Sequence, residues 1–467
     1  MNNYTVYHLH SDYSLLDSCT KFEEYVNKAV ELGQKAIAST EHGNIFNWVK
    51  KKEYCDSKGI KYIHGCEIYL THKLYHKRKV LIENKSESYV EIADKKIKDN
   101  YHTILLAKNQ EGIKEINSLV SKSYNSDYFY FKPRISFDDF LNISDNIIST
   151  SACLASPLWS IQETILKNNQ EIKISENELQ DLINAKEGFR YKSDNSKLEK
   201  IKNKIEVLEF NIQEIKKEND SLEYYFDKLL RKYTYLEVQP HINSEKQKKF
   251  NKQLIEYHNK YGIPLVAGTD THSLNDYKAQ CRTILQTAKH IEFLDEDTFD
   301  LTYKSYEEIY NMFKKQNVLS DDLINEALNN TNIIADLVED FELDKSFKYP
   351  ILKSKEEDEA EFVKRCWDKL EEKIKSKIID INRKSEYVSR INEELSVFKK
   401  VGMLGFMLSM SDFIGESRNE GIPFGFSRGS AGGSLCAYLT DINDIDPIIF
   451  DTNFARFCNE DRIESGD

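Results

Sequence analysis

Short apolar or β-branched segments alternate with longer amphipathic segments of helical period from Asn3 to about Asp270. This alternation is typical of parallel β/α folds, in which a helix follows each strand and covers the sheet. We therefore predict an α/β unit of seven strands closed into a distorted β/α barrel. The expected strands are residues 4–10, 35–40, 61–69, 101–107, 146–152, 233–239 and 263–269.

One long segment, residues 156–232, interrupts this alternation between the fifth and sixth strands. Apolar residues recur in its second half every three or four positions from Leu198 to Leu229, with Asn219 as one polar member, which predicts a helical coiled-coil insertion. Two interpretations remain open. The segment folds back as a helical hairpin on the apolar residues of 159–166 and 179–185, or it docks a partner or a second protomer.

Helical periods dominate after His272, with helices expected at 306–313, 323–337 and 387–400. The acidic residues 355–361 are typical of a linker or a solvated face. These patterns divide the chain into four predicted parts. They are a metal-binding barrel (1–155 and 233–280), the coiled-coil insertion (156–232), a helical connecting region (281–384) and a final unit (385–467) with a glycine and serine cluster.

The composition restricts the environment of the chain. Eight cysteines are widely spaced without a CxxC pair, which favours a reducing cytoplasm, and we expect no membrane segment. A formal net charge of -13 argues against wrapping of nucleic acid around the whole surface, although local basic surfaces remain compatible with it.

Candidate metal ligands recur at the ends of the expected strands. His8 and His10 share the first strand, where the two-residue repeat directs both imidazoles to the same face. His102 opens the fourth strand, and most of the others lie at or just beyond strand ends, the functional face of β/α barrels. The nine candidates are His8, His10, Asp17, His42, Glu67, His102, Cys153, Asp270 and His272.

Each of these residues alone has a simpler explanation. His102 precedes an apolar run and on its own is more typical of a buried histidine, and Cys153 on its own is more typical of a small core residue. Nine polar groups that meet at one barrel mouth would carry a large desolvation cost without a metal. The mixture of imidazoles, carboxylates and a thiol suits up to three adjacent Zn, Mn or Fe ions.

The segments that carry these residues resemble the PHP (polymerase and histidinol phosphatase) domain in order and spacing. The resemblance implies a seven-stranded barrel with a trinuclear metal cluster that hydrolyses phosphoesters, and in polymerases such a site removes 3'-terminal nucleotides. Glu41 departs from the family, whose members usually have Asp at this position. The matching segments are 8–10, 14–17, 40–44, 65–67, 102–109, 132–135, 152–154 and 269–272.

A second resemblance runs from about Leu395 to the last residue and concerns the palm of bacterial C-family replicative polymerases. It implies an α+β nucleotidyltransferase palm that performs DNA-templated nucleotidyl transfer with Mg ions. The sequence differs from the family at 425–427 and at 440–441. The matching segments are 394–397, 402–406, 412–414, 421–423, 428–435, 444–447, 456–457, Asn459 and Arg462.

Three residues of this palm segment are candidates for substrate binding. Gly429 and Ser430 lie in a glycine-rich turn whose backbone N–H groups are able to approach a triphosphate, Arg428 is placed to neutralise it, and residues 435–439 are expected to form the following helix. Glu464 and Asp467 do not match the aspartate pair that holds the Mg ions in this family. We therefore expect no polymerisation catalyst within this chain, and a separate or missing C-terminal polymerase chain to complete the palm.

The sequence thus predicts the N-terminal portion of a replicative DNA polymerase with a PHP site that acts as a 3'–5' exonuclease or phosphoesterase. The expected partners are a DNA primer-template, deoxynucleoside triphosphates and a replisome component at the coiled-coil insertion. Two alternatives stay open. One is a free-standing PHP phosphatase, which the palm segment disfavours, and the other is a non-catalytic replisome scaffold whose metals only hold the barrel together.

Overall fold

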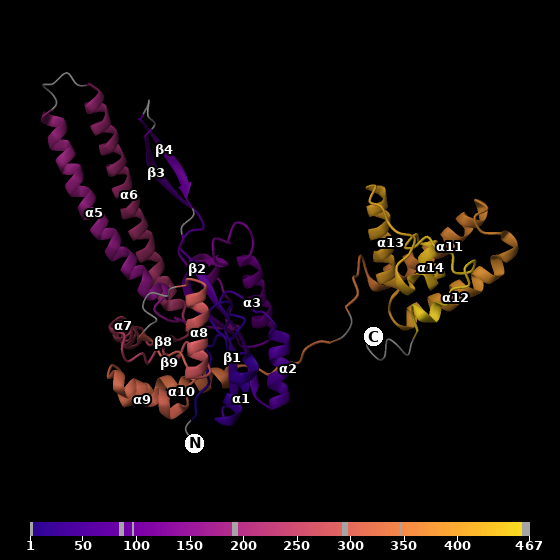
Figure 1. The fold of residues 1–467 in the computed structure, drawn as a ribbon, viewed down its shortest axis with the longest axis horizontal. Helices are drawn as coiled ribbons and strands as arrows, with labels where there is room; N and C mark the ends of the chain where they lie inside the picture. The colour runs from indigo at the N-terminus through magenta and orange to yellow at the C-terminus, as the bar shows by residue number, and fades with distance from the viewer. Residues whose placement is uncertain are drawn as a thin grey trace. The chain divides into compact units, whose positions relative to one another are not determined.

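The computed structural model describes residues 3–83, 88–95, 98–188, 195–291, 298–345 and 348–459. The chain divides into two compact units, Met1–Leu343 and Asp344–Asp467 (Figure 1). Buried hydrophobic residues between Tyr4 and Val338 form the cores of the first unit, and those between Phe362 and Cys458 form the core of the second. Each unit therefore has a hydrophobic core of its own.

A five-stranded mixed sheet is the centre of the first unit. β1 (Ala36–Ser39) pairs in parallel with β2 (Lys61–Thr71), which pairs antiparallel with β5 (Tyr101–Ala107) and, near its end, in parallel with β6 (Arg134–Ser136). β5 pairs antiparallel with β7 (Ile147–Thr150). Two further pairs are the antiparallel hairpin of β3 (His76–Glu83) and β4 (Ser88–Lys95) and the parallel pair of β8 (Leu236–Val238) and β9 (Leu265–Ala267).

Single β-bridges connect these sheets to one another and to the N-terminal segment. Val6 pairs with Ile37 of β1, and Leu9 pairs with Thr271 beyond β9. Thr150 of β7 pairs with Tyr235, next to β8. The mixed α/β prediction is confirmed, although residues 4–10 form two bridges and no continuous strand.

The prediction of an entirely parallel arrangement is wrong for β5, which runs antiparallel to both of its neighbours. Among the described residues between β2 and β5, the chain forms the β3–β4 hairpin and no helix. A parallel connection needs a crossover, usually a helix, whereas a chain that returns through a hairpin reverses its direction. Neither this hairpin nor β6 was predicted from the sequence. The reversal places His102, at the start of β5, opposite Tyr69 near the end of β2.

Helices cover the sheets of the first unit. α1 buries Phe22, Tyr25, Val26 and Ala29 along one amphipathic face, and α7 ends at Gly262 in the left-handed conformation (φ +70°) that favours glycine. The bounds are α1 (Phe22–Glu31), α2 (Trp48–Lys58), α3 (Gln110–Ser123), α4 (Phe137–Leu141), α7 (Glu245–Tyr261), α8 (Asp276–Ala288), α9 (Tyr306–Gln316) and α10 (Asp321–Leu337). The helices predicted over 306–313 and 323–337 are therefore present.

α10 is fixed to the strands by two side chains. The Asn330 amide donates a hydrogen bond to the Leu265 carbonyl of β9 (2.6 Å). The Thr331 hydroxyl accepts one from the backbone N–H of Thr5 (2.9 Å). Residues as far along the chain as α10 therefore pack with the first unit.

The insertion forms two long helices, α5 (Pro157–Gly188) and α6 (Asn195–Lys232), which lie side by side in Figure 1. Ile172 and Leu179 of α5 pack with Ile212 and Ile215 of α6. Buried Asn219, the polar member of the apolar repeat, bonds across to the amides of Asn168 (2.8 Å) and Asn169 (3.0 Å). These contacts support the helical hairpin, while coiled-coil geometry and partner docking stay predictions.

The second unit is helical over its described residues. α11 (Lys355–Lys375), α12 (Lys384–Lys400), α13 (Leu404–Asn419) and α14 (Leu435–Leu439) are joined by the short 3-10 helices η3 (Ile381–Arg383), η4 (Gly429–Gly433) and η5 (Phe454–Arg456). The acidic residues 355–361 begin α11 and are not a linker. No strand occurs within 348–459, so the predicted α+β character is not seen there; the apolar runs between the helices are short and broken by Gly, Ser and Pro.

None of the described helices is both long enough and apolar enough to cross a membrane. All eight cysteines are free thiols. The fold is therefore held by non-covalent packing.

Because each unit has its own core, we expect a chain that ends at Leu343 to fold without the second unit. Circular dichroism should show a cooperative thermal transition for this shortened chain, with a midpoint close to the transition of the same unit in the full chain. A shortened chain without cooperative unfolding would contradict the division.

Candidate metal centre

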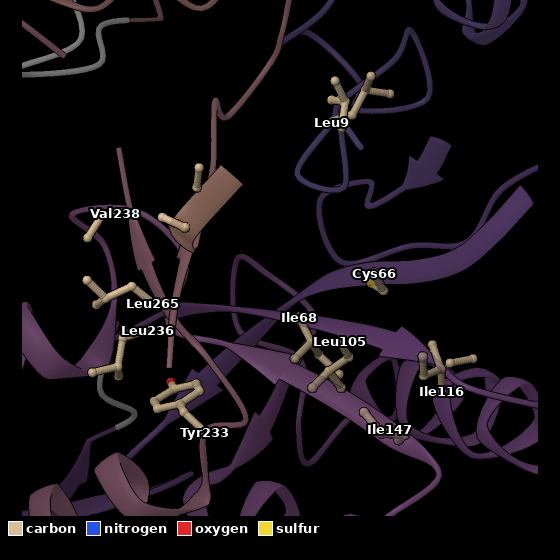
Figure 2. Close-up of a cluster of buried hydrophobic side chains, with 14 of the residues drawn as sticks. Leu9, Cys66, Ile68, Leu105, Ile116, Ile147, Tyr233, Leu236, Val238 and Leu265 are labelled. Carbon is tan, nitrogen blue, oxygen red and sulfur yellow. The ribbon is translucent and has the colours of Figure 1, made fainter. Parts of the chain in front are cut away.

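The alternation of side chains along extended segments separates the candidate ligands from the hydrophobic core. Leu9 is buried in the core between His8 and His10, and Cys66 and Ile68 are buried there on either side of Glu67. Figure 2 shows Leu9, Cys66 and Ile68 within this hydrophobic cluster. Because successive side chains of an extended chain point to opposite faces, the imidazoles and the carboxylate are directed away from it.

The carboxylate of Glu67 lies at the centre of the polar cluster. Its Oε2 atom is 2.9 Å from His10 Nε2, 3.3 Å from His8 Nε2 and 3.3 Å from His42 Nδ1. Its Oε1 atom contacts His102 Nδ1. One carboxylate thus contacts four imidazoles, as expected of a group that bridges neighbouring cations.

Two aspartates complete the anionic side of the cluster. Asp270 Oδ1 lies 3.0 Å from His8 Nε2 and 3.3 Å from His10 Nε2, and Asp270 has a left-handed backbone (φ +48°). Asp17 Oδ2 lies 2.9 Å from His42 Nε2 and 3.6 Å from His272 Nε2. The left-handed backbone conformation of Asp270 is uncommon outside glycine, asparagine and aspartate, and it is frequent at functional sites.

All nine predicted ligands lie in this cluster. Seven of them form three overlapping groups whose ligand atoms lie within 4.8 Å of one another: His8, His10, Glu67 and Asp270; His10, His42 and His272; and His42, Glu67 and His102. Asp17 adjoins the second group through His42, and Cys153 Sγ lies 3.7 Å from His102 Nδ1 at the edge of the third. Only the reversed direction of β5 places His102 at the edge where the other segments end.

Several of these atoms lack a well-oriented hydrogen-bond partner among the described residues although they are buried. They are His10 Nε2, His42 Nδ1, Glu67 Oε1 and Asp270 Oδ1. Leaving buried polar atoms unsatisfied costs free energy, and these atoms converge without the angles that hydrogen bonds require. Imidazole nitrogens and carboxylate oxygens that converge in this way fit divalent cations.

Hydrogen bonds behind the cluster orient three of the imidazoles. His8 Nδ1 donates to Glu237 Oε1 (2.6 Å), His10 Nδ1 to Ser14 Oγ (3.2 Å) and His272 Nδ1 to the carbonyl of Asp270 (2.8 Å). With Nδ1 as the protonated nitrogen, each ring presents the lone pair of Nε2 to the cluster. This is the support that metal-binding histidines usually have.

Glu41, the position that differs from the PHP pattern, holds the loop between the ligands. It accepts hydrogen bonds from Lys51 Nζ (2.6 Å), Ser14 Oγ (2.6 Å) and the backbone N–H of Ser11 (3.0 Å). Burial by itself raises the pKa of Glu41, but the ammonium group of Lys51 and these hydrogen bonds outweigh burial and lower it to about 2. Glu41 is therefore an anion at neutral pH that fixes Ser14 under His10.

Glu67 and His42 are held in their charged forms by groups of opposite charge in the cluster. Burial by itself raises the pKa of Glu67, but the imidazoles of His102 and His42 outweigh it and hold this pKa well below its usual range. Burial likewise lowers the pKa of His42, but the carboxylates of Glu67 and Asp17 outweigh it and raise this pKa to about 10. Without a metal, protons bound to imidazole thus balance the negative charge of the carboxylates.

Two charged residues that were not predicted from the sequence support the cluster. Glu237 holds His8 and lies between core residues Leu236 and Val238, so its signal was a carboxylate within an otherwise apolar strand. A Cβ atom on Gly268 would lie 2.1 Å from Glu237 Oε1, so this glycine makes room for the carboxylate. Arg282 of α8 binds Asp17 through its carboxylate and, at 2.6 Å, its carbonyl oxygen.

The predicted substrate-binding residues of the second unit lie on an exposed turn. Arg428, Gly429 (φ +59°) and Ser430 precede α14, which spans the residues predicted for the following helix. The buried carboxylate of Glu394 already accepts hydrogen bonds from the N–H groups of Leu435 (2.8 Å) and Cys436 (2.9 Å). The Glu394 side chain therefore already occupies the N–H groups at the start of α14 that an external anion would need.

Removing the carboxylate behind His8 should weaken metal binding. We expect Glu237→Gln to lower the affinity for Zn or Mn about 10-fold to 100-fold, because the orientation and basicity of His8 depend on this group. Titration calorimetry on the variant and on the exposed control Glu245→Gln measures the effect. Equal affinities of the two variants would contradict the assignment of Glu237 as a supporting residue.

Metal affinity should also depend on pH. Since the pKa of His42 is raised to about 10, its imidazole is protonated at neutral pH in the metal-free protein, and a metal must displace that proton. The apparent affinity should rise about tenfold per pH unit for each displaced proton between about pH 6 and 9. Affinity that is constant over this range would show that binding does not involve these imidazoles.

Comparison with known proteins relates both units to established families. Residues 7–191 match the PHP domain, and residues 360–467 match the bacterial DNA polymerase III alpha NTPase domain. DNA polymerase III subunit alpha of Borreliella burgdorferi is 31% identical over 98% of this chain and 34% of its own length. The subunits of Aquifex aeolicus (28%) and Helicobacter pylori strain 26695 (30%) are similar over 98% and 99% of this chain and 35% of their own.

The chain thus spans about a third of the length of these relatives. The two family matches fall in separate compact units, the first of which contains the polar cluster. The chain is thus similar to the PHP domain in its first unit and to the DNA polymerase III alpha NTPase domain in its second, and over nearly its whole length it is similar to the N-terminal third of DNA polymerase III alpha subunits.

Proposed function

We propose that this chain is the N-terminal portion of a replicative DNA polymerase alpha subunit, and that its PHP domain removes 3'-terminal nucleotides as a metal-dependent exonuclease. The observation that carries this proposal is the convergence of seven imidazole and carboxylate groups in the first unit. Five of them lie within residues 7–191, which match the PHP domain: His8, His10, His42, Glu67 and His102. The NTPase match in the same chain supports DNA as the proposed phosphodiester substrate.

The finer fold of the first unit belongs to this proposal. The N-terminal segment, β1, β2, β5, β7, β8 and β9 are connected in that order by strand pairs and bridges, and the bridge from Leu9 to Thr271 leads back to the N-terminal segment. This order supports a closed, seven-stranded barrel with one reversed strand. The barrel is interrupted by residues 156–232 and covered by helices that extend to α10.

Up to three divalent ions, drawn from Zn, Mn and Fe, fit the three ligand groups, with Asp17 and Cys153 as outer ligands. Such ions polarise a phosphoryl oxygen and lower the pKa of bound water. Glu67 would help to hold these ions, because its carboxylate belongs to two of the three ligand groups and contacts imidazoles with both oxygens. Glu237 and Ser14 keep His8 and His10 in the tautomers that present Nε2.

The second unit would contribute the nucleotide-binding turn of the polymerase. Because Glu394 occupies the first N–H groups of α14, we propose that Gly429 and Ser430 bind the triphosphate through the turn itself and that Arg428 neutralises it. The Mg ions and their aspartates would come from a further polypeptide segment. Glu464 and Asp467 lie outside the described residues, so their comparison with these aspartates stays a prediction.

The proposed partners follow from this function: a DNA primer-template, deoxynucleoside triphosphates, the segment that completes the palm and a replisome component at the hairpin of α5 and α6. A free-standing phosphatase for small monoesters is not favoured, because such an enzyme has no use for the NTPase segment at 360–467. A non-catalytic scaffold would bind metal without hydrolysing DNA.

A double substitution of the central ligands tests the exonuclease. We expect His8→Ala combined with His10→Ala to abolish Mn-dependent shortening of a 5'-labelled primer, because two of the three ligand groups lose imidazoles. The matched control is His258→Ala on α7, whose ring bonds to the Ile263 carbonyl outside the cluster. Gel analysis that shows undiminished shortening by the double variant would refute the proposed activity.

A further inference from the structure

An aromatic and basic turn lies beside the ligand cluster and has no part in it. Residues 128–132 read Tyr-Phe-Tyr-Phe-Lys, between α3 and β6. The phenyl ring of Phe131 is 63% exposed, Phe129 is 41% exposed, and Lys132 is exposed as well. Hydrophobic side chains of this size are usually buried, so a run that presents them to solvent points to a ligand.

The backbone of this turn adds a second observation. Phe131 has a left-handed conformation (φ +59°), which is a true outlier for a bulky residue. A hydrogen bond from the Tyr130 N–H to the Lys132 carbonyl (3.1 Å) closes the turn around it. Glycine or asparagine would relieve this strain at no cost in core packing, since the phenyl ring is outside the core. A binding role of the exposed phenyl ring would therefore explain why a strained phenylalanine occupies this position.

Positive charge accompanies the exposed rings. Lys98 Nζ lies 4.5 Å from the centre of the Phe131 ring, and Lys132 Nζ lies 5.4 Å from the centre of the Tyr69 ring. The neighbouring carboxylate of Asp99 is already bound by Arg134 (3.1 Å) and by the Thr71 hydroxyl (2.6 Å). Two ammonium groups therefore lie at this turn, although the whole chain carries a net negative charge.

The turn adjoins the predicted ligands through Tyr69. The Tyr69 ring lies 5.0 Å from the ring of His102 and 6.2 Å from that of His42, centre to centre. Pro133 packs so closely on the loop of His42 that a Cβ atom on Gly43 would lie 2.7 Å from it. One aromatic ring thus lies between the ammonium group of Lys132 and two of the ligand imidazoles.

We propose that this turn, residues 128–132 with Lys98, binds the single-stranded 3'-terminal segment of DNA next to the metal centre. A base stacks on the exposed face of Phe131, and Lys98 and Lys132 contact the phosphates on either side. Exposed aromatic faces interleaved with cations are the usual way in which proteins hold unpaired nucleic acid without sequence preference. The assignment rests on the proposed exonuclease, and it adds that the site selects unpaired over paired 3' ends.

Binding to two oligonucleotides tests the stacking contact in the full chain. Fluorescence anisotropy, with Ca²⁺ to suppress hydrolysis, measures the Kd of labelled oligothymidylate and of an abasic oligonucleotide of the same length. We expect Phe131→Ala to weaken oligothymidylate binding about tenfold more than abasic binding, because only the former has a base to stack. Phe131→Trp should restore the preference for bases, and the exposed control Tyr224→Ala on α6 should keep the wild-type preference.

Two outcomes would overturn the assignment. One is an equal effect of Phe131→Ala on both oligonucleotides, and the other is a wild-type protein that binds them equally well. Neither depends on catalysis, so a protein that shows base-dependent binding through Phe131 but does not shorten primers would refute the exonuclease and leave the binding surface intact. Shortening of primers without any effect of Phe131 on base preference would refute the binding surface and leave the exonuclease intact.

Discussion

The contact of one buried carboxylate, Glu67, with four imidazoles is the constraint on which the first unit depends. Charged groups removed from water must be balanced by partners of opposite charge, and here the partners come from three separate segments of the chain. Those segments must therefore be brought to one edge with the correct faces. The pairing of β2 with β5 and the bridges of the N-terminal segment achieve this.

The hydrophobic core and the polar cluster are two faces of the same extended segments. Leu9, Cys66 and Leu236 are buried in the core, while their neighbours lie on the other face, where His8 contacts both Glu67 and Glu237. A shift of register by one residue in any of these segments would exchange the two faces. Core packing thus fixes the positions of the ligands before any metal is considered.

Much of this organisation could be predicted from the sequence. The alternation of apolar and amphipathic segments predicted six of the seven strand segments. The recurrence of His, Asp and Glu at segment ends predicted the nine clustered residues. Both signals are local in the sequence. The antiparallel direction of β5 and the β3–β4 hairpin could not, because strand direction depends on how the intervening chain returns. Glu237 and Arg282 escaped notice because their importance arises only from contacts with residues far away in sequence.

In the second unit, Glu394 shows how local sequence signals mislead about ligands. A glycine-rich turn before a helix suggests an anion site, yet the first N–H groups of α14 are bound by a carboxylate that precedes them by about 40 residues. Only the exposed turn at 428–430 remains for a phosphate group.

The metal content of the purified full chain, measured by inductively coupled plasma mass spectrometry after loading with Mn or Zn and dialysis, tests the central claim most directly. Between one and about three ions per chain are predicted, and a chain that retains none would contradict the assignment of the cluster as a metal centre.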